Sequence, residues 1–457
     1  MKLKNLKKIY FLGVGGIGMS ALARYFNDNG VEVIGYDLVK TSLTQELEAE
    51  GIVIGYKDEV KFLTKDIDLV VLTPAIPDSN KQLNWFRDQG IPIKKRAEVL
   101  GIISKEKETI AVAGTHGKTT TSCLLAHILT QADLDVTAFL GGLLAQEITI
   151  YIKGKSNLVV LEADEYDRSF LHLSPQILVI ISMDPDHLDI YGTVEEMYAA
   201  YRQLTMQIPE GGTLVLGPGV YPLMSVDWIY ELGKRKIEVR RIFSDFDYKA
   251  VTVKDHKYHF SFDSKTSKKV VKFTSGLPGL HNVTNSCLAI EVGKILGVPS
   301  RKMQKSIADF KGIKRRFETV YDKKRILIDD YAHHPEEVSC AIKTVRRLYP
   351  ESKVVGIFQP HLFSRTQDFY RGFASELSGL DGVLLMPIYP AREEPIVGIE
   401  SEIIYNLLAV DDKELVDENT LISELDSRNE YDIVMTIGAA DLDKYHKEII
   451  RVLNKET

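Results

Sequence analysis

Short apolar runs alternate with amphipathic stretches along most of the chain. In the first hundred residues the runs lie at residues 9–14, 31–36 and 69–73, and helical spacing of apolar positions follows them. Runs of this length predict buried strands, and strands that alternate with helices predict a parallel sheet covered by helices. We therefore expect an α/β unit at residues 1–105.

The same pattern starts again twice. Apolar runs at residues 109–113, 158–161 and 177–181 form a second series, with helices expected near Gly117 and Val194. Around residues 251–273 the pattern changes, and apolar and polar residues alternate one by one, which predicts a β-rich insertion. A third series begins near Phe317, with runs at residues 325–330, 354–358, 382–386 and 433–437. A chain of 457 residues is too long for one core, so we expect further domains at 106–312 and 313–457.

Composition excludes several classes of protein. The net charge of -7 argues against a nucleic-acid partner, because binding to phosphates needs a basic surface. No apolar run approaches the ~20 residues that span a bilayer, so membrane insertion is not expected. Three cysteines (Cys123, Cys287 and Cys340) are widely spaced and form no zinc-binding pattern. A cytoplasmic protein fits these features best.

The strongest local motif is Gly-Thr-His-Gly-Lys-Thr-Thr-Thr at residues 114–121, directly after an apolar run. Glycines let backbone N–H groups surround phosphate oxygens, a lysine reaches the β- and γ-phosphates, and a threonine hydroxyl binds Mg²⁺. Val112 stands where the first glycine of the standard pattern would be, and Gly114 provides a shorter loop. We predict ATP and Mg²⁺ binding by Gly114, Thr115, His116, Gly117, Lys118, Thr119 and Thr120.

A second glycine-rich turn, Gly-Val-Gly-Gly-Ile-Gly at residues 13–18, follows the first predicted strand. Asp37 ends the next strand about twenty residues on, as in dinucleotide-binding domains. A dehydrogenase would bind a pyrophosphate here, and so would a domain that binds the diphosphate of a UDP-sugar. The turn alone does not distinguish these ligands.

Acidic side chains follow two strands of the second series. Glu-Ala-Asp-Glu-Tyr-Asp occupies residues 162–167, and Asp-Pro-Asp-His-Leu-Asp occupies residues 184–189. Ligands of α/β sheets bind at the carboxyl ends of the strands, and carboxylates there can hold a hard cation. His187 lies among the acids of the second run.

Together these motifs resemble the Mur ligase family. The phosphate motif and both acidic runs occur in the family's usual order with His-Asn-Val-Thr-Asn at residues 281–285, Gly-Ile-Lys-Arg-Arg-Phe-Glu at 312–318 and Asp-Asp-Tyr-Ala-His-His-Pro at 329–335. The match covers essentially the whole chain. Details such as Ser-Phe-Leu-His-Leu at 169–173 and Phe-Gln-Pro-His-Leu-Phe-Ser-Arg-Thr at 358–366 are similar to the members that add alanine.

The resemblance implies three α/β domains: a Rossmann-like domain for a UDP-sugar, a central P-loop ATPase-type domain and a Rossmann-like C-terminal domain. It implies ATP-dependent ligation of L-alanine to the lactyl carboxylate of UDP-N-acetylmuramate through an acyl phosphate, in a monomer or weak homodimer. The implied catalytic residues are Lys118, Glu162 and His187, and the implied metal ligands are Thr119, Glu162 and His187.

Further residues are implied for each substrate. The nucleotide would also contact Asn285, Arg316 and Asp330. The UDP-sugar would contact Gly15, Gly16, Ile17, Gly18, Asp37, Thr73 and Ala75. The amino-acid side would hold Tyr331, His333, His334 and Arg365.

The sequence departs from the family's usual pattern at a position that bears on the amino-acid site, and two alternative functions stay open. Leu362 stands where some relatives have an arginine, so Arg365 would hold the carboxylate of the amino acid alone or with a partner elsewhere. Within the family, the alternative is the recycling ligase that joins a tripeptide to the same sugar nucleotide. In a different class, it is an NAD-dependent dehydrogenase, which leaves the Gly-Lys-Thr loop unexplained.

Overall fold

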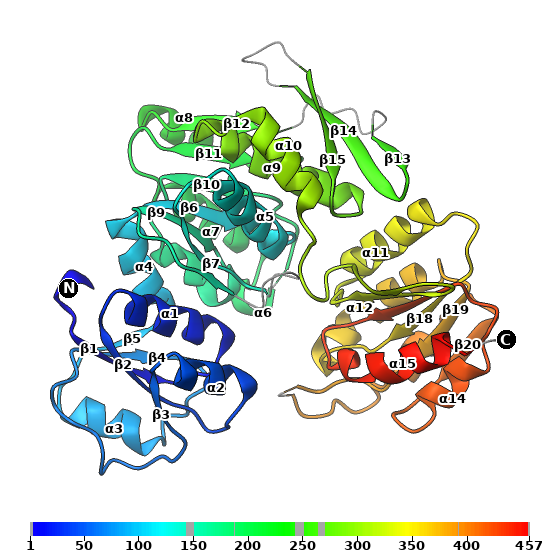
Figure 1. Ribbon diagram of the computed structural model, residues 1–457, viewed down its shortest axis with the longest axis horizontal. Helices are drawn as coiled ribbons and strands as arrows, with labels where there is room; N and C mark the ends of the chain where they lie inside the picture. Colours follow the sequence, from blue (N-terminus) through cyan, green and yellow to red (C-terminus); the bar gives the residue numbers. More distant parts are fainter. Residues whose placement is uncertain are drawn as a thin grey trace. The chain divides into compact units, whose positions relative to one another are not determined.

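The N-terminal part of the chain builds a parallel sheet of five strands in the order β3-β2-β1-β4-β5 (Figure 1). The computed structural model describes residues 3–142, 150–186, 188–242, 251–263, 270–391 and 393–455. The strands are β1 (Lys8–Leu12), β2 (Glu32–Tyr36), β3 (Val53–Gly55), β4 (Leu69–Leu72) and β5 (Ile93–Lys95). The helices are α1 (Ile17–Asp28), α2 (Ser42–Ala49), α3 (Lys81–Asp88) and α4 (Arg96–Glu106). The carboxyl ends of β1 and β4, where the strand order changes direction, form the edge expected to bind ligands.

The middle of the chain builds a sheet of seven strands in the order β12-β11-β10-β6-β9-β7-β8. Its strands are β6 (Glu108–Ala113), β7 (Thr137–Phe139), β8 (Tyr151–Ile152), β9 (Leu158–Glu162), β10 (Ile177–Ile180), β11 (Thr213–Leu216) and β12 (Glu238–Arg241). Its helices are α5 (Lys118–Gln131), α6 (Leu188–Tyr191), α7 (Val194–Thr205), α8 (Val226–Lys234), α9 (Leu280–Ile295) and α10 (Ser300–Asp309). Because β6 pairs with β9 on one side and β10 on the other, the loops after these three strands are neighbours.

These two sheets share one apolar core. The ring of Tyr25 on α1 lies 5.4 Å from the ring of Phe139 on β7. A β-carbon on Gly101 of α4 would come within 2.6 Å of the carbonyl oxygen of His172. The first expected domain boundary, after residue 105, falls in the last turn of α4. The two sheets therefore belong to one compact unit, which comprises Met1–Asp247, Phe262–Val271 and Thr284–Phe310.

The second unit comprises Tyr248–Ser261, Lys272–Val283 and Lys311–Thr457. Its six-stranded sheet has the order β16-β17-β21-β18-β19-β20, and only the pair formed by β16 and β17 is antiparallel. The strands are β16 (Glu318–Asp322), β17 (Ile326–Asp330), β18 (Val354–Phe358), β19 (Gly382–Leu385), β20 (Asp412–Leu415) and β21 (Ile433–Ile437). The helices are α11 (Pro335–Leu348), α12 (Phe363–Leu377), α13 (Glu402–Tyr405), α14 (Leu421–Asp426) and α15 (His446–Leu453).

The β-rich insertion expected around residues 251–273 is present. It is a three-stranded sheet of β13 (Thr252–Lys254), β14 (Lys257–Asp263) and β15 (Val270–Ser275). Among the residues that the structure describes, no helix is both long and apolar enough to cross a bilayer.

Candidate active site

The predicted phosphate loop joins β6 to α5, as its sequence indicates. Gly114 and Gly117 have φ angles of 135° and 81°, in the region that favours glycine. Gly117 is the N-cap of α5, and because glycine has no side chain it cannot cap the N–H groups at the start of the helix. The first N–H groups of a helix have no partner within the helix, so this end of α5 can bind an anion.

Lys118, the first residue of α5, points back over the loop. Its Nζ donates to the carbonyl oxygens of Gly114 at 2.9 Å and Thr115 at 3.4 Å, and to Oε1 of Glu165 at 2.6 Å. The side chain of Lys118 is 14% exposed and that of Glu165 is 1% exposed. Burial lowers the pKa of Lys118, but the neighbouring carboxylates, Glu165 first and then Asp164 and Glu162, together hold this pKa above its usual value. The loop therefore holds a charged ammonium group.

Two of the three predicted metal ligands lie together. The hydroxyl of Thr119 donates to Oε1 of Glu162 at 3.0 Å, and the backbone N–H of Gly141 donates to Oε2 of the same carboxylate at 3.0 Å. A hydroxyl and a carboxylate are the oxygen donors that Mg²⁺ prefers. These two residues thus fit a magnesium ion. His187, the third predicted ligand, lies outside the described residues.

The segment after β10 lies against the phosphate loop. The hydroxyls of Thr115 and Ser182 are 2.9 Å apart, and the backbone N–H of Asp184 donates to the hydroxyl of Thr115 at 3.0 Å. The backbone N–H of His116 donates to Oγ of Ser182 at 3.3 Å. Thr120 is buried in the first turn of α5. The second acidic run therefore begins beside the loop.

Asn285 of α9 lies directly against the other side of the phosphate loop. A β-carbon on Gly117 would be 2.7 Å from Oδ1 of this buried asparagine. The predicted nucleotide residues of the first unit therefore surround one loop.

Replacing Gly117 with alanine is expected to weaken ATP binding at least tenfold and to destabilise the fold by about 2 kcal/mol. A left-handed backbone costs a non-glycine residue about 1–2 kcal/mol, and the added methyl group would collide with Asn285. Gly211→Ala is the matched control, since Gly211 has a φ of 78° and nothing within 4 Å of the added carbon. Thermal unfolding and ATP titration of both variants test this. Equal loss of ATP affinity in the two would contradict the assigned role of the loop.

The predicted UDP-sugar turn lies between β1 and α1. Asp37 holds this turn, because its Oδ2 accepts from the backbone N–H of Gly15 at 2.8 Å. Thr73 lies after β4 against the turn, since a β-carbon on Gly13 would be 2.3 Å from its Cγ2. Gly16 is the N-cap of α1, Ile17 begins the helix with a largely exposed side chain, and Ala75 is exposed in the segment after β4.

A cation that the sequence analysis missed lies over this turn. Nη1 of Arg96 would be 2.5 Å from a β-carbon on Gly18. Arg96 is the first residue of α4 and directly follows β5. A basic residue at the carboxyl end of a short strand is the signal that could have identified it.

In the second unit, Asp330 lies at the end of β17. Its carboxylate accepts from the backbone N–H groups of Phe317 at 2.9 Å and Ala332 at 2.8 Å. Burial raises the pKa of Asp330 to about 7, although Arg316 opposes this shift. The guanidinium of Arg316 lies 5.2 Å from the centre of the Tyr331 ring. The predicted nucleotide residues Arg316 and Asp330 are therefore neighbours of the predicted amino-acid residue Tyr331.

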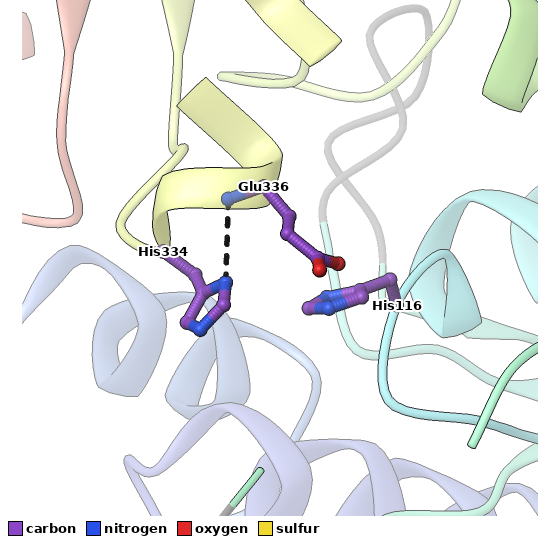
Figure 2. Close-up of side chains that lie close together, drawn as sticks. All are labelled: His116, His334 and Glu336. Carbon is purple, nitrogen blue, oxygen red and sulfur yellow. Dashed lines mark hydrogen bonds between the residues drawn. The ribbon is translucent and has the colours of Figure 1, made fainter. Parts of the chain in front are cut away.

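The two adjacent histidines differ in their surroundings. Nδ1 of His333 lies 3.0 Å from the carbonyl oxygen of Tyr331, and burial lowers the pKa of His333. Figure 2 shows the start of α11, where the backbone N–H of Glu336 donates to Nδ1 of His334 over 3.4 Å, and it also labels His116 of the phosphate loop. His334 is thus the N-cap of α11.

Arg365 lies in the first turn of α12. In the described part of the chain, Arg365 makes no hydrogen bond or ion pair with another residue. Burial is the main cause that lowers the pKa of His333 and of His361, and the positive charge of Arg365 lowers both further. Leu362, before this helix, has a φ of 71°. A half-buried guanidinium that carries no ion pair can receive a carboxylate.

Three family models match successive parts of the chain. They are "Mur ligase family, catalytic domain" at residues 8–108, "Mur ligase middle domain" at 112–293 and "Mur ligase, glutamate ligase domain" at 315–440. The UDP-N-acetylmuramate–L-alanine ligase of Porphyromonas gingivalis is 43% identical over 451 residues, which are 96% of this chain and 97% of the relative. The chain belongs to the Mur ligase family.

Two further comparisons extend this result. A ligase of the same name from Flavobacterium johnsoniae is 42% identical over the full length of both chains. The crystal structure of UDP-N-acetylmuramate–alanine ligase MurC from Thermotoga maritima is 27% identical, covers 97% of this Mur ligase and 98% of its own chain, and has a TM-score of 0.77. The expected three-domain α/β fold is confirmed. This Mur ligase is accordingly an ATP-dependent ligase, and the dehydrogenase alternative has no support.

Glu165 is the second residue of this Mur ligase that the sequence analysis did not select. It lies in the acidic run after β9, but Glu162 was the acid chosen for function. Nothing in the run itself distinguishes an acid that faces the phosphate lysine from one that faces solvent. The distance of 2.6 Å to Lys118 provides that distinction.

Proposed function

We propose that this Mur ligase joins L-alanine to the lactyl carboxylate of UDP-N-acetylmuramate in peptidoglycan precursor synthesis. The observation that carries the proposal is the 43% identity, over 96% of the chain, to a relative named for this reaction. ATP would be the second substrate and Mg²⁺ the metal.

The first step is the transfer of the γ-phosphoryl group to the lactyl carboxylate. An oxygen of the lactyl carboxylate attacks the γ-phosphorus, and the bond between this phosphorus and the bridging β-phosphate oxygen breaks. ADP departs, and the lactyl group becomes an acyl phosphate. Lys118 would neutralise charge on the phosphate oxygens, and N–H groups at the start of α5 would bind them. Thr119, Glu162 and His187 would hold Mg²⁺, which neutralises phosphate charge when it is bound.

The second step forms the amide bond. The amine of alanine attacks the acyl carbon, and the tetrahedral intermediate expels phosphate. Because an ammonium group cannot attack, alanine must first lose a proton, and the candidates to accept it are the nearby carboxylates or, when it does not hold the metal, His187. Arg365 would bind the carboxylate of alanine, with Tyr331, His333 and His334 on the same side.

The remaining assignments follow the domains. We propose boundaries at 1–105, 106–312 and 313–457. The turn at residues 15–18, with Asp37, Thr73, Ala75 and also Arg96, would bind the diphosphate of the UDP-sugar. Asn285 would contact adenine, and Arg316 and Asp330 would reach the nucleotide from the last domain. We propose a cytoplasmic monomer or weak homodimer that binds no nucleic acid.

ADP release with different amines tests the substrate. We expect L-alanine to be the best amine, with detectable activity for glycine and L-serine. Selectivity among these should be modest, because one methyl group contributes only about 1–3 kcal/mol to discrimination. D-glutamate and the tripeptide L-Ala-D-Glu-meso-diaminopimelate should be poor substrates. Higher activity with the tripeptide would make this protein a recycling ligase and would leave the family unchanged.

A further inference from the structure

The ion pair between Lys118 and Glu165 occupies the lysine that the nucleotide needs. An ammonium group has three N–H donors. In this structure they face the carbonyl oxygens of Gly114 and Thr115 and the carboxylate of Glu165. The lysine can bind a phosphate oxygen only when it gives up one of these partners.

Glu165 is the partner that a phosphate replaces most directly, since both are anions. The two loop carbonyls carry only partial charge, whereas the carboxylate approaches Nζ to 2.6 Å. A buried cation cannot bind two anions at full strength, and each must compete for it. The nucleotide and Glu165 are therefore rivals for Lys118.

The backbone of Glu165 is held in place. Its carbonyl oxygen accepts from the hydroxyl of Tyr191 at 2.7 Å and from the backbone N–H of Arg168 at 3.0 Å. The next turn is closed by the N–H of Phe170, which donates to the carbonyl oxygen of Asp164 at 2.9 Å. By contrast, lysine has four rotatable methylene groups. The backbone of Glu165 therefore offers a fixed point to which the longer side chain of Lys118 can return.

We propose that Glu165 is a positioning residue for Lys118: it holds the lysine while the nucleotide site is empty, yields it to the phosphates of ATP, and takes it back as ADP leaves. The inference rests on the proposed function, because it requires Lys118 to bind the nucleotide. Glu165 then has two effects. It keeps the buried cation of Lys118 paired while the nucleotide site is empty, and it weakens the hold of the site on ADP.

Glu165→Gln separates this role from a purely structural one. The amide keeps the size of the side chain and can still accept a hydrogen bond from Lys118, but it no longer competes as an anion. We expect the Kd for ADP, measured calorimetrically at fixed Mg²⁺, to fall at least tenfold, with slower release of a fluorescent ADP analogue. A structural role predicts the opposite, because a disordered Lys118 would bind ADP more weakly.

Two variants serve as controls. Asp164→Asn removes a negative charge one residue away, from a carboxylate that accepts from the backbone N–H of Tyr166 at 3.1 Å, and should change the Kd for ADP less than threefold. A similar gain in Asp164→Asn would reduce the effect to general charge and overturn the inference. Glu165→Asp shortens the side chain and should give an intermediate Kd. If neither Glu165 variant folds, the pair is required for structure and the exchange is refuted.

Lys118→Met in the same assay tests the assumption that Lys118 binds the nucleotide. Loss of ADP binding in Lys118→Met, with weaker binding in Glu165→Gln, would overturn the exchange and leave the proposed function standing. Unchanged ADP binding and turnover in Lys118→Met would instead show that Lys118 does not bind the nucleotide, which overturns the exchange and leaves the proposed reaction standing.

Discussion

Lys118→Ala should lower kcat for ligation by roughly 100- to 1000-fold, the range for loss of a group that stabilises charge in the transition state. It should also destabilise the protein, because Glu165 would remain buried without its cation. Removing one partner of a buried pair costs about 3–5 kcal/mol. Binding of UDP-N-acetylmuramate should survive, since the turn after β1 has no bond to Lys118 among the hydrogen bonds of the described residues. Turnover, chemical unfolding and calorimetric binding of the UDP-sugar measure the three effects.

The double variant Lys118→Met with Glu165→Gln separates stability from chemistry. It removes both charges and keeps the volume of the side chains, so most of the stability lost in Lys118→Ala should return. Activity should remain low, because no cation faces the phosphates. Near-normal turnover in either variant would show that Lys118 is not the lysine that binds phosphate.

Glu162→Gln should raise the Mg²⁺ concentration for half-maximal activity at least tenfold and lower kcat. The substitution keeps the size of the side chain beside Thr119 and Gly141, and it removes the negative charge that attracts the cation. Even residues that only orient metal ligands change metal affinity by about 10–100-fold. A titration of activity with Mg²⁺ at constant free ATP measures the shift.

Glu108→Gln is the matched control for this result. Glu108 is an exposed acid at the amino end of β6, the end of the strand opposite to the phosphate loop. Its substitution should leave the Mg²⁺ requirement unchanged. If Glu162→Gln needs no more Mg²⁺ than the control does, Glu162 does not bind the metal. Its role would then be to hold the backbone at Gly141.

The central strands of the three large sheets could be predicted from the sequence. β1, β6, β10 and β18 are buried almost throughout, and buried parallel strands read as continuous apolar runs. β3 and β5 are three residues long and partly exposed, so they carry no such signal. β7 has three residues and β8 only two, and β8 is the edge strand of its sheet.

Sequence motifs identified the phosphate loop and the pairing of Thr119 with Glu162, because each residue type is required by its chemistry. The family resemblance assigned Arg316, and not its neighbour Arg315, to the nucleotide. In the structure Arg315 turns inward to Asp329 at 3.1 Å and to the carbonyl oxygen of Gly438 at 2.8 Å, so its role is structural.

The sequence by itself identified the family, and it selected most of the residues that we propose to bind phosphate and metal. Tertiary structure alone decided which acid meets Lys118 and which cation covers the turn at Gly18. Glu165 is separated from Lys118 by 47 positions, and they meet because β9 pairs with β6 and brings the following loops together. Arg96 reaches Gly18 because the sheet order places β4 beside β1 and β5 beside β4. Local sequence encodes side-chain chemistry, but such distances are set by strand order and packing.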